Sequence, residues 1–145
     1  MKISTRGRYG VRMMLDLAMH EGHGPVSLKD IAARQEISEK YLSNIVPPLR
    51  NAGLVVSVRG SRGGYALGKK PREITLKDIL LVLEGPMCLV ECTGQPKICR
   101  RADECLMRDI WAQVSDRILD TLGTFDLETM VEQQKSKEHA ATYEI

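Results

Sequence analysis

Residues 27–67 read SLKDIAARQEISEKYLSNIVPPLRNAGLVVSVRGSRGGYAL, and this stretch decides the fold. Its first half has the apolar spacing of two short helices separated by a tight turn at residues 35–37. Its second half has the β-branched, alternating composition of a hairpin with an Arg/Gly-rich tip. Two short helices followed by such a hairpin make a winged helix-turn-helix, so the sequence predicts a mainly helical fold with a small β-hairpin wing.

Serines mark the start of both helices. Ser27 is followed three residues later by Asp30, a capping box with Asp in place of the commoner Glu, and Ser38 precedes the second helix. Pro47 and Pro48 lie inside the second helix and remove two backbone donors. We therefore expect a kink, or an early end of the regular helix, near residues 43–46.

The second helix has an apolar face and a polar face. Its buried residues would be Leu42, Ile45, Val46 and Leu49. The cap and the outward face would present Ser38, Glu39, Lys40, Tyr41, Ser43 and Asn44. Hydrogen-bonding side chains of this kind suit base edges and phosphates in the major groove of DNA.

The hairpin tip is thin and cationic. The glycines between residues 60 and 64 can adopt positive φ and allow a close approach to a neighbour. Arg59 and Arg62 stand on this loop with Gly63 and Gly64, which predicts contacts to the minor groove or backbone of DNA. The alternative is an ordinary surface hairpin with solvated arginines. The order of helices, hairpin, glycines and arginines favours DNA binding.

Charge is distributed unevenly along the chain. The 145 residues carry a net charge of +2, but residues 1–85 hold 14 Lys/Arg against 8 Asp/Glu, and residues 86–145 hold 7 against 11. The basic half contains the helix-turn-helix and the hairpin, as a DNA-binding surface requires. No apolar run approaches the ~20 residues of a membrane span, and no signal peptide is evident, so we expect a cytoplasmic protein.

Further helices are expected on either side of the opening stretch. Residues 4–20 have an apolar stripe that includes Met13 and Met14. Arginines on the other side of that helix are either solvated or contact phosphates; they are Arg6, Arg8 and Arg12. Thr75 and Asp78 repeat the capping pattern and open a helix that the Gly-Pro pair at 85–86 stops.

All four cysteines lie between residues 88 and 105. In a cytoplasmic protein such a cluster is more typical of metal binding or redox chemistry than of structural disulfides. Cys92, Cys99 and Cys105 lack the paired C-x-x-C spacing of structural zinc sites and suit a loop around an iron–sulfur cluster. Spacing alone leaves a cluster, zinc and metal-free redox thiols open. Cys88 has apolar neighbours and is expected to be a buried apolar residue.

A long helix is expected from about residue 103, with apolar residues at intervals of four and a stop at Gly123. Its apolar face is wide for a helix after a complete small domain, so pairing with a second copy is favoured over packing on its own domain. A short helix at 126–134 would pack against it, followed by a polar tail with Tyr143 and Ile145 as apolar anchors.

The predicted organisation therefore has four parts. Residues 1–85 form the DNA-binding domain and residues 86–105 the cysteine loop. Residues 106–134 hold the dimerisation helix and a short packing helix, and residues 135–145 form the tail.

Four segments together resemble a known family. They are STRGRYGVRMMLDLA at 4–18, ISEKYLSNIVPPLRNAGLVVSVRGSRGGYALGK at 37–69, LEGP at 83–86, and three cysteines before an Ile-Trp helix. They resemble the IscR/CymR family of bacterial winged-helix regulators over nearly the whole chain. The resemblance implies a transcriptional regulator, with repression as the expected sense, that binds palindromic promoter DNA as a homodimer joined through its long helix.

The resemblance also implies a cofactor. IscR-like and NsrR-like members bind an iron–sulfur cluster through three cysteines before the long helix, which map by position to Cys92, Cys99 and Cys105. Arg108 stands where IscR of enteric bacteria has a His ligand. Cys88, a partner-subunit side chain and a small exogenous ligand are therefore candidates for the fourth ligand, and both 2Fe–2S and 4Fe–4S clusters stay open.

A second branch of the same family offers a different interpretation. The opening MKIST and the LEGP segment look closer to CymR-like members, which lack these cysteines and control cysteine metabolism through a protein partner. A regulator controlled by a partner or by thiol redox state is thus the alternative to a cluster sensor. An enzyme is disfavoured, because no His or carboxylate set with catalytic spacing lies near the cysteines and no phosphate-cradling motif is present.

Overall fold

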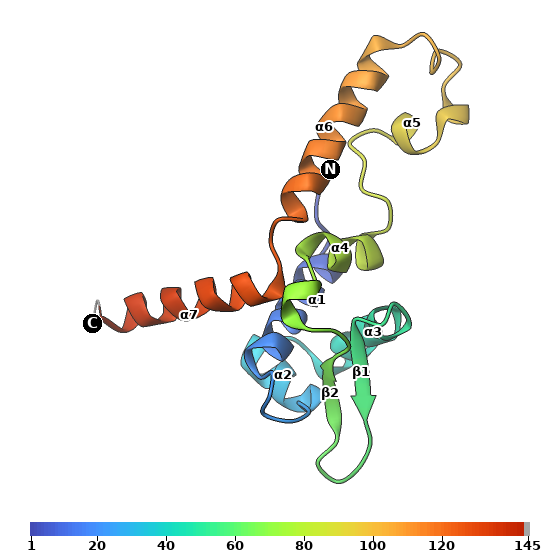
Figure 1. Ribbon diagram of the computed structural model, residues 1–145. Coiled ribbons are helices and arrows are strands. Elements are labelled where there is room, and N and C mark those ends of the chain that lie inside the picture. The colour runs from blue at the N-terminus through green and yellow to red at the C-terminus, as the bar shows by residue number, and fades with distance from the viewer. Residues whose placement is uncertain (144–145) are drawn as a thin grey trace.

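The computed structural model describes residues 1–143, the side chain of Tyr143 excepted (Figure 1). Its helices are α1 Thr5–Met19, α2 Leu28–Gln35, α3 Glu39–Asn51, α4 Leu76–Glu84, α5 Glu91–Gly94, α6 Leu106–Leu122 and α7 Leu127–Tyr143. Strands β1 Val55–Val58 and β2 Gly64–Leu67 form an antiparallel hairpin, and 3-10 turns lie at η1 Pro71–Glu73 and η2 Pro96–Ile98. The predicted fold class is confirmed: a winged helix-turn-helix is followed by a long C-terminal helix.

The core lies between α1, α2, α3, α4 and the hairpin. The predicted stripe of α1 is buried, with Met13 and Met14 at 0% exposure. The predicted inner face of α3 is buried as well, and it consists of Leu42, Ile45, Val46 and Leu49. These aliphatic and thioether side chains fill a core that contains almost no aromatic rings.

Both predicted serine caps are present, but the reciprocal bond of the predicted capping box, from the Ser27 N–H to the Asp30 carboxylate, is not found among the described residues. The Ser27 hydroxyl accepts the Asp30 N–H at 3.1 Å, and the Ser38 hydroxyl accepts the Tyr41 N–H at 3.0 Å. Between the two helices Glu36 takes a left-handed conformation with φ 55°, a position that glycine often occupies. The turn therefore forms without glycine and places α3 across the end of α2.

Helix α3 continues through Pro47 and Pro48 to Asn51, so the expected early end of this helix is wrong. The two prolines leave the carbonyls of Ser43 and Asn44 without their usual helical donors. Both residues are exposed, so water can satisfy these carbonyls. The buried face of α3 is left intact and holds the helix on the core.

The hairpin pairs Val55 with Leu67 at its base and Val58 with Gly64 at its tip. Residue Val26 adds a further bridge on the other side of β2, since its N–H and carbonyl each bond to Tyr65 at 2.8 Å. This bridge ties the wing to the loop before α2. The short sequence around Val26 gave no strand signal, so the bridge was not predicted.

Positive φ is needed at only one position of the hairpin tip, Gly60 with φ 125°. Gly63 and Gly64 do not adopt positive φ, contrary to the expectation for the whole glycine run. Their role is to leave space: a Cβ atom would collide with the Val58 carbonyl at Gly63 and with the Val26 carbonyl at Gly64. These two glycines therefore permit close backbone packing at the base of the loop.

The cysteine-bearing segment leads away from the core after α4, and helix α6 lies beside it and returns to the core (Figure 1). Its lower end is fixed where the Leu76 N–H donates to the Phe125 carbonyl at 2.8 Å and the Leu127 N–H donates to the Ile74 carbonyl at 2.9 Å. These bonds anchor the junction of α6 and α7 to the start of α4. Among residues 1–143 no helix is long and apolar enough to cross a membrane.

The last helix differs from the sequence prediction in length and in contacts. Helix α7 runs to Tyr143 rather than ending near residue 134, and it packs mainly on α1 and η1 rather than on α6. Leu127 is fully buried, and Met130 and Val131 contact the core. The expected anchors, Ile145 and the Tyr143 side chain, lie outside the described residues.

Candidate nucleic-acid interface and cysteine loop

The outer face of α3 is polar and open to solvent. Five of the predicted contact residues are exposed here: Ser38, Glu39, Lys40, Ser43 and Asn44. The Ser43 hydroxyl donates to the Lys40 carbonyl at 2.5 Å, which leaves its oxygen available as an acceptor. The helix thus presents the mixture of donors and acceptors that a base-reading helix needs.

Tyr41 does not simply face outward as predicted. Its ring is half-buried and meets the ring of Tyr9 edge to face, with centroids 5.6 Å apart. The guanidinium of Arg12 lies 5.5 Å from the centroid of the Tyr9 ring. Tyr41 therefore links α3 to α1, and sequence reasoning missed this role because the two aromatic residues are far apart in the chain.

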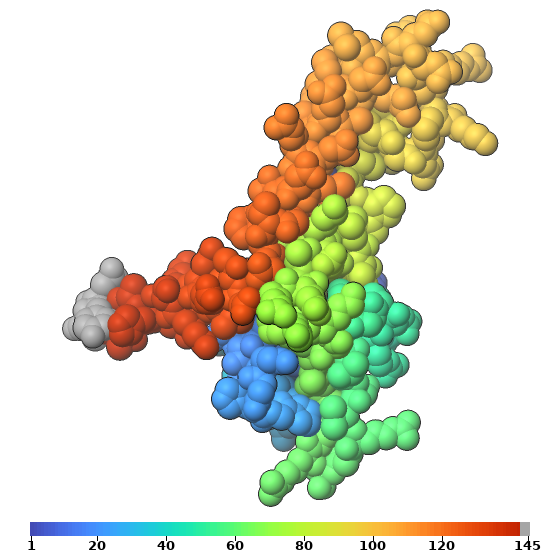
Figure 2. Space-filling model, viewed as in Figure 1, coloured from blue at the N-terminus to red at the C-terminus, as the bar shows by residue number. Residues whose placement is uncertain are grey.

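The wing tip projects from one end of the molecule (Figure 2). Arg59 and Arg62 are exposed, and neither has a hydrogen-bond or ion-pair partner within residues 1–143. Gly63 and Gly64 are half-buried beneath them, at the base of the loop. Two unpaired guanidinium groups on a thin loop can approach a phosphate backbone without first breaking an internal ion pair.

The arginines of α1 have different surroundings. Arg8 is exposed and makes only a 3.3 Å bond to Thr5 nearby. The guanidinium of Arg12 donates instead to the side chain and the backbone carbonyl of Gln35, at the end of α2. Arg12 therefore holds the helix-turn-helix together, while Arg6 and Arg8 remain available at the start of α1.

The start of α1 is joined to the end of α4. The N–H and hydroxyl of Ser4 donate to the Glu84 carboxylate at 2.9 and 2.5 Å. Gly7 and Gly10 face α4, where a Cβ atom would collide with the side chains of Glu84 and Leu83. This close packing fixes α1 beside the point at which the chain leaves the domain for the cysteine loop.

All four cysteines are free thiols. Cys88, Cys92 and Cys105 are half-buried and Cys99 is exposed. Cys88 is thus less buried than expected, and its Sγ would lie 3.3 Å from a Cβ atom added at Gly94. Cys105 stands at the N-terminal end of α6.

Two hydrogen bonds fasten the cysteine-bearing segment to α6. The Leu89 N–H donates at 3.1 Å to the hydroxyl of Ser115, which is only 4% exposed. The Arg108 Nε donates to the Cys92 carbonyl at 3.2 Å. The residue that replaces the expected His thus contacts the backbone of a predicted ligand residue, a contact that spacing along the chain could not show.

The predicted ligands have suitable chemistry but do not form a ligand group in this chain. Within residues 1–143 no three His, Cys, Asp or Glu side chains are placed to hold a metal ion. Thiolates are the ordinary ligands of iron–sulfur clusters. Binding of a cluster by Cys92, Cys99 and Cys105 therefore requires the segment between them to rearrange.

Large apolar side chains are exposed along the upper part of α6. Leu106 is 69% exposed and Trp111 38%, and Met107, Ile110 and Val114 continue the surface. Nearer the core, Ser115 is covered by the cysteine-bearing segment. An apolar surface of this kind beside the cysteine loop is typical of a protein–protein contact.

Comparison with known proteins agrees with this arrangement. The family Rrf2, described as an iron-dependent transcriptional regulator, matches residues 3–133. The chain is 43% identical to the HTH-type transcriptional regulator CymR of Bacillus subtilis (strain 168) over 145 residues, 100% of each chain.

Two solved structures of such regulators resemble this fold almost equally. The structure of B. subtilis CymR, the global cysteine regulator, gives a TM-score of 0.77 at 44% identity, over 92% of this chain and 98% of that one. T. potens IscR gives a TM-score of 0.76 at 42% identity, over 92% and 88%. These relatives are transcriptional regulators and not enzymes. The chain belongs to the Rrf2 family of transcriptional regulators.

Proposed function

We propose that this Rrf2-family protein binds palindromic promoter DNA as a homodimer and represses transcription, and that the state of its cysteine loop sets its affinity for DNA. The observation that carries the regulatory part is the fastening of the loop to α6 by Leu89 and Arg108. A change in the loop would act directly on α6, whose exposed apolar residues are the proposed contact between subunits.

The DNA contacts are assigned to two elements. The exposed polar face of α3 would lie in the major groove, and Arg59 and Arg62 of the wing would contact the backbone or the minor groove. Figure 2 places the wing tip and the cysteine loop at opposite ends of the chain. Regulation therefore has to act through the relative placement of two subunits, since the loop cannot touch DNA bound by its own wing.

An iron–sulfur cluster held by Cys92, Cys99 and Cys105 is the first candidate for the signal. Such a cluster, when bound, supplies sensitivity to oxidants, nitric oxide and iron supply. The residues of this chain would provide three thiolates on a segment that Arg108 keeps against α6. Ordering this segment against α6 would change the surface offered to the second subunit.

The alternative is a cluster-free regulator controlled by a protein partner or by thiol oxidation. One observation favours it: the three thiols do not converge within residues 1–143. The similarity of the chain to CymR and to IscR is nearly equal and favours neither version. In this case partner binding or thiol oxidation would change the cysteine loop, and the loop would in turn change the exposed apolar surface of α6.

One experiment separates these two versions. The full chain is purified anaerobically, its absorbance spectrum is recorded, and iron, zinc and acid-labile sulfide are counted per chain. Equal iron and sulfide in coloured protein, lost in Cys92→Ala, support the cluster. Cys88→Ala is made beside it to test the fourth ligand, because Cys88 is one of the candidates for it. Unchanged iron and sulfide in this variant would exclude Cys88 as a ligand, and their loss would include it. Colourless protein without iron excludes the cluster and leaves the partner or thiol version.

DNA binding is measured in parallel by fluorescence anisotropy, on duplexes that the wild-type chain selects from a random library. The cluster version predicts that Cys92→Ala remains folded and dimeric but differs from the loaded wild type in affinity. Failure of the wild-type chain to select any DNA, loaded or metal-free, would contradict the proposed function as a whole.

A further inference from the structure

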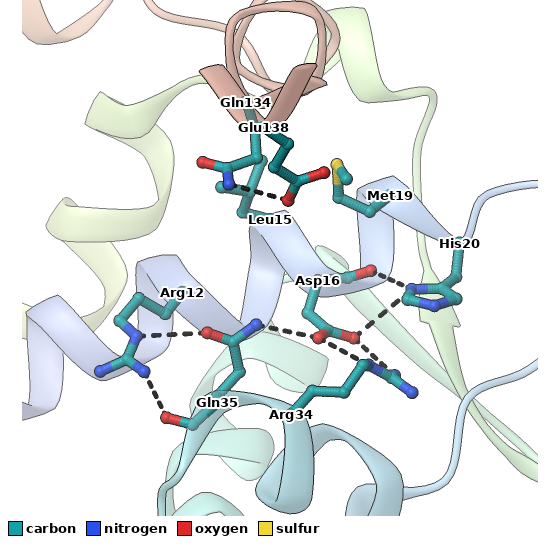
Figure 3. A pocket seen from close by; sticks show the side chains of 9 residues that line it. All are labelled: Arg12, Leu15, Asp16, Met19, His20, Arg34, Gln35, Gln134 and Glu138. Atoms are coloured by element: carbon teal, nitrogen blue, oxygen red, sulfur yellow. Dashed lines mark hydrogen bonds and ion pairs between the residues drawn. The ribbon is translucent and has the colours of Figure 1, made fainter. Parts of the chain in front are cut away.

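A cleft of about 490 Å³ lies between α1, the end of α2 and α7 (Figure 3). None of its lining residues belongs to the wing or to the cysteine loop. Its volume falls within the roughly 300–1,000 Å³ of small-molecule sites. Leu15 and Met19 of α1 contribute its apolar lining. Its polar lining consists of Arg12, Asp16, His20, Arg34, Gln35, Gln134 and Glu138. The Nδ1 atom of His20 lies 3.5 Å from the Asp16 carboxylate.

The acidic group at the bottom of the cleft is already neutralised. Asp16 is 4% exposed, and its carboxylate accepts from Arg34 Nε at 3.0 Å, Arg34 Nη2 at 2.8 Å and Gln35 Nε2 at 2.9 Å. The hydrogen bond to Asp16 raises the pKa of Arg34, which stays charged. Arg34 Nη1 and Arg12 Nη1 have no hydrogen-bond partner within the described part of the chain, so both guanidinium groups keep donors for a ligand.

The opposite wall of the cleft comes from α7 and carries the other charge. One oxygen of Glu138 accepts from Gln134 Nε2 at 2.9 Å, and the second oxygen has no hydrogen-bond partner among residues 1–143. Figure 3 shows Gln134 and Glu138 on one side of the cleft and Arg12, Gln35 and Arg34 on the other. The two guanidinium groups of the lining are matched by two carboxylates, so these four groups together favour neither an anion nor a cation.

We propose that this cleft binds a free α-amino acid with an apolar side chain. The ligand carboxylate would accept from the remaining donors of Arg12 and Arg34, and its ammonium group would donate to Glu138. Its side chain would lie on Leu15 and Met19. A zwitterion satisfies both walls at once, whereas a simple amine or a simple acid satisfies only one.

The cleft is connected to the DNA-reading helix through Arg12. This guanidinium bonds to Gln35 at the end of α2 and lies over the Tyr9 ring, which contacts Tyr41 of α3. A ligand carboxylate on the remaining donor of Arg12 would act on the same guanidinium that supports the turn before α3. Occupancy of the cleft is therefore expected to alter DNA affinity, and DNA is expected to alter ligand affinity by the same factor.

The test uses L-leucine as the probe in isothermal titration with the full chain. Isoamylamine, which lacks the carboxylate, and 4-methylvalerate, which lacks the ammonium group, are titrated beside it. L-Leucine should bind and the two analogues should bind at least about threefold more weakly. Glu138→Gln should weaken L-leucine binding by about three- to tenfold. Glu132→Gln, an exposed glutamate of the same helix outside the cleft, should leave it unchanged.

Three results would overturn the proposal. They are no binding of L-leucine or L-methionine up to about 10 mM, equal binding of isoamylamine or 4-methylvalerate, and equal loss of binding in Glu138→Gln and Glu132→Gln. DNA affinity is measured with and without L-leucine on the wild-type chain. The proposal does not depend on the cysteine loop, so it can be tested whichever version of the proposed function holds.

Discussion

At the residue scale, the ion pair between Asp16 and Arg34 joins α1 to α2, with Asp16 buried and Arg34 partly exposed. Asp16→Asn removes the charge and one of the acceptors that Arg34 uses, but the guanidinium can return to water. We expect a loss of about 1–3 kcal/mol in the free energy of unfolding, measured by urea denaturation. Asp120→Asn on the exposed side of α6 is the control and should change it by less than about 0.5 kcal/mol.

The stability that the Asp16–Arg34 pair contributes should not depend on pH between pH 7 and pH 9. The folded-state pKa of Arg34 is raised by its bond to Asp16, so the stabilisation is fully present at every pH below the ordinary pKa of an arginine, which lies well above pH 9. The difference between wild type and Asp16→Asn should therefore be the same at pH 7 and pH 9. A difference that shrinks between these two values would contradict the assignment of the effect to this pair.

The wing arginines give a second prediction at this scale. Arg59→Ala removes an exposed, unpaired cation from the hairpin tip, so it should weaken DNA binding and lower the slope of log affinity against log salt by about one. Anisotropy titrations over a salt series measure both quantities. Lys137→Ala, an exposed cation of α7, is the matched control. Identical slopes for Arg59→Ala and wild type would show that Arg59 does not contact phosphate.

The sequence predicted hydrogen bonds between residues close together in the chain, but it did not predict side-chain bonds between distant residues. The caps at Ser27, Ser38 and Thr75 depend on side chains three residues apart, so the sequence predicted them correctly. The bonds from Arg12 to Gln35 span 23 residues and depend on how α1 crosses α2. Arg12 therefore read as one more solvent-facing or phosphate-contacting arginine.

At the element scale, α3 shows how burial can override a local preference. Two interior prolines predicted a kink or an early end, and the early end is wrong: the helix keeps its full length because its apolar face is anchored in the core. Pro47→Ala restores a backbone donor to the Ser43 carbonyl, so it should raise the free energy of unfolding by about 1–3 kcal/mol. Urea denaturation followed by circular dichroism measures the change.

Pro71→Ala is the matched control for that experiment. Pro71 is the first residue of the turn η1, where a proline removes no helical hydrogen bond. Its replacement should leave stability unchanged or lower it by up to about 1 kcal/mol, because a flexible unfolded chain gains entropy. If Pro47→Ala is no more stable than Pro71→Ala, Pro47 does not lower the free energy of unfolding of the chain.

Helix α7 is longer than the sequence predicted and packs on a different helix. Its apolar residues are confined to the first turns, so the sequence predicted only a short helix. Beyond Val131 the chain continues with good helix formers, and the Gln134 side chain donates to Glu138 one turn later. The pattern gave no reason to place this helix on α1, because the choice between α1 and α6 depends on the direction in which the chain leaves Gly123.

At the scale of the whole molecule, the N-terminal half of α6 exposes apolar side chains that no other part of the described chain covers. Leu106, Met107 and Trp111 are 69%, 45% and 38% exposed and lie on a helix that stands away from the core (Figure 1). A second copy packed on the same surface would bury these side chains. We therefore expect the full chain to be a dimer in sedimentation velocity experiments.

Trp111→Glu tests the position of the interface. A charge at the centre of an apolar contact lacks a partner, so this variant should dissociate to monomers that keep the wild-type helical content by circular dichroism. Gln113→Glu adds the same charge at an exposed polar site of α6 and should remain dimeric. The monomer should also bind a palindromic duplex at least about 100-fold more weakly, because its two half-sites are no longer engaged together. A Trp111→Glu chain that stays dimeric would place the contact between subunits elsewhere and would remove the route by which the cysteine loop is proposed to reach DNA.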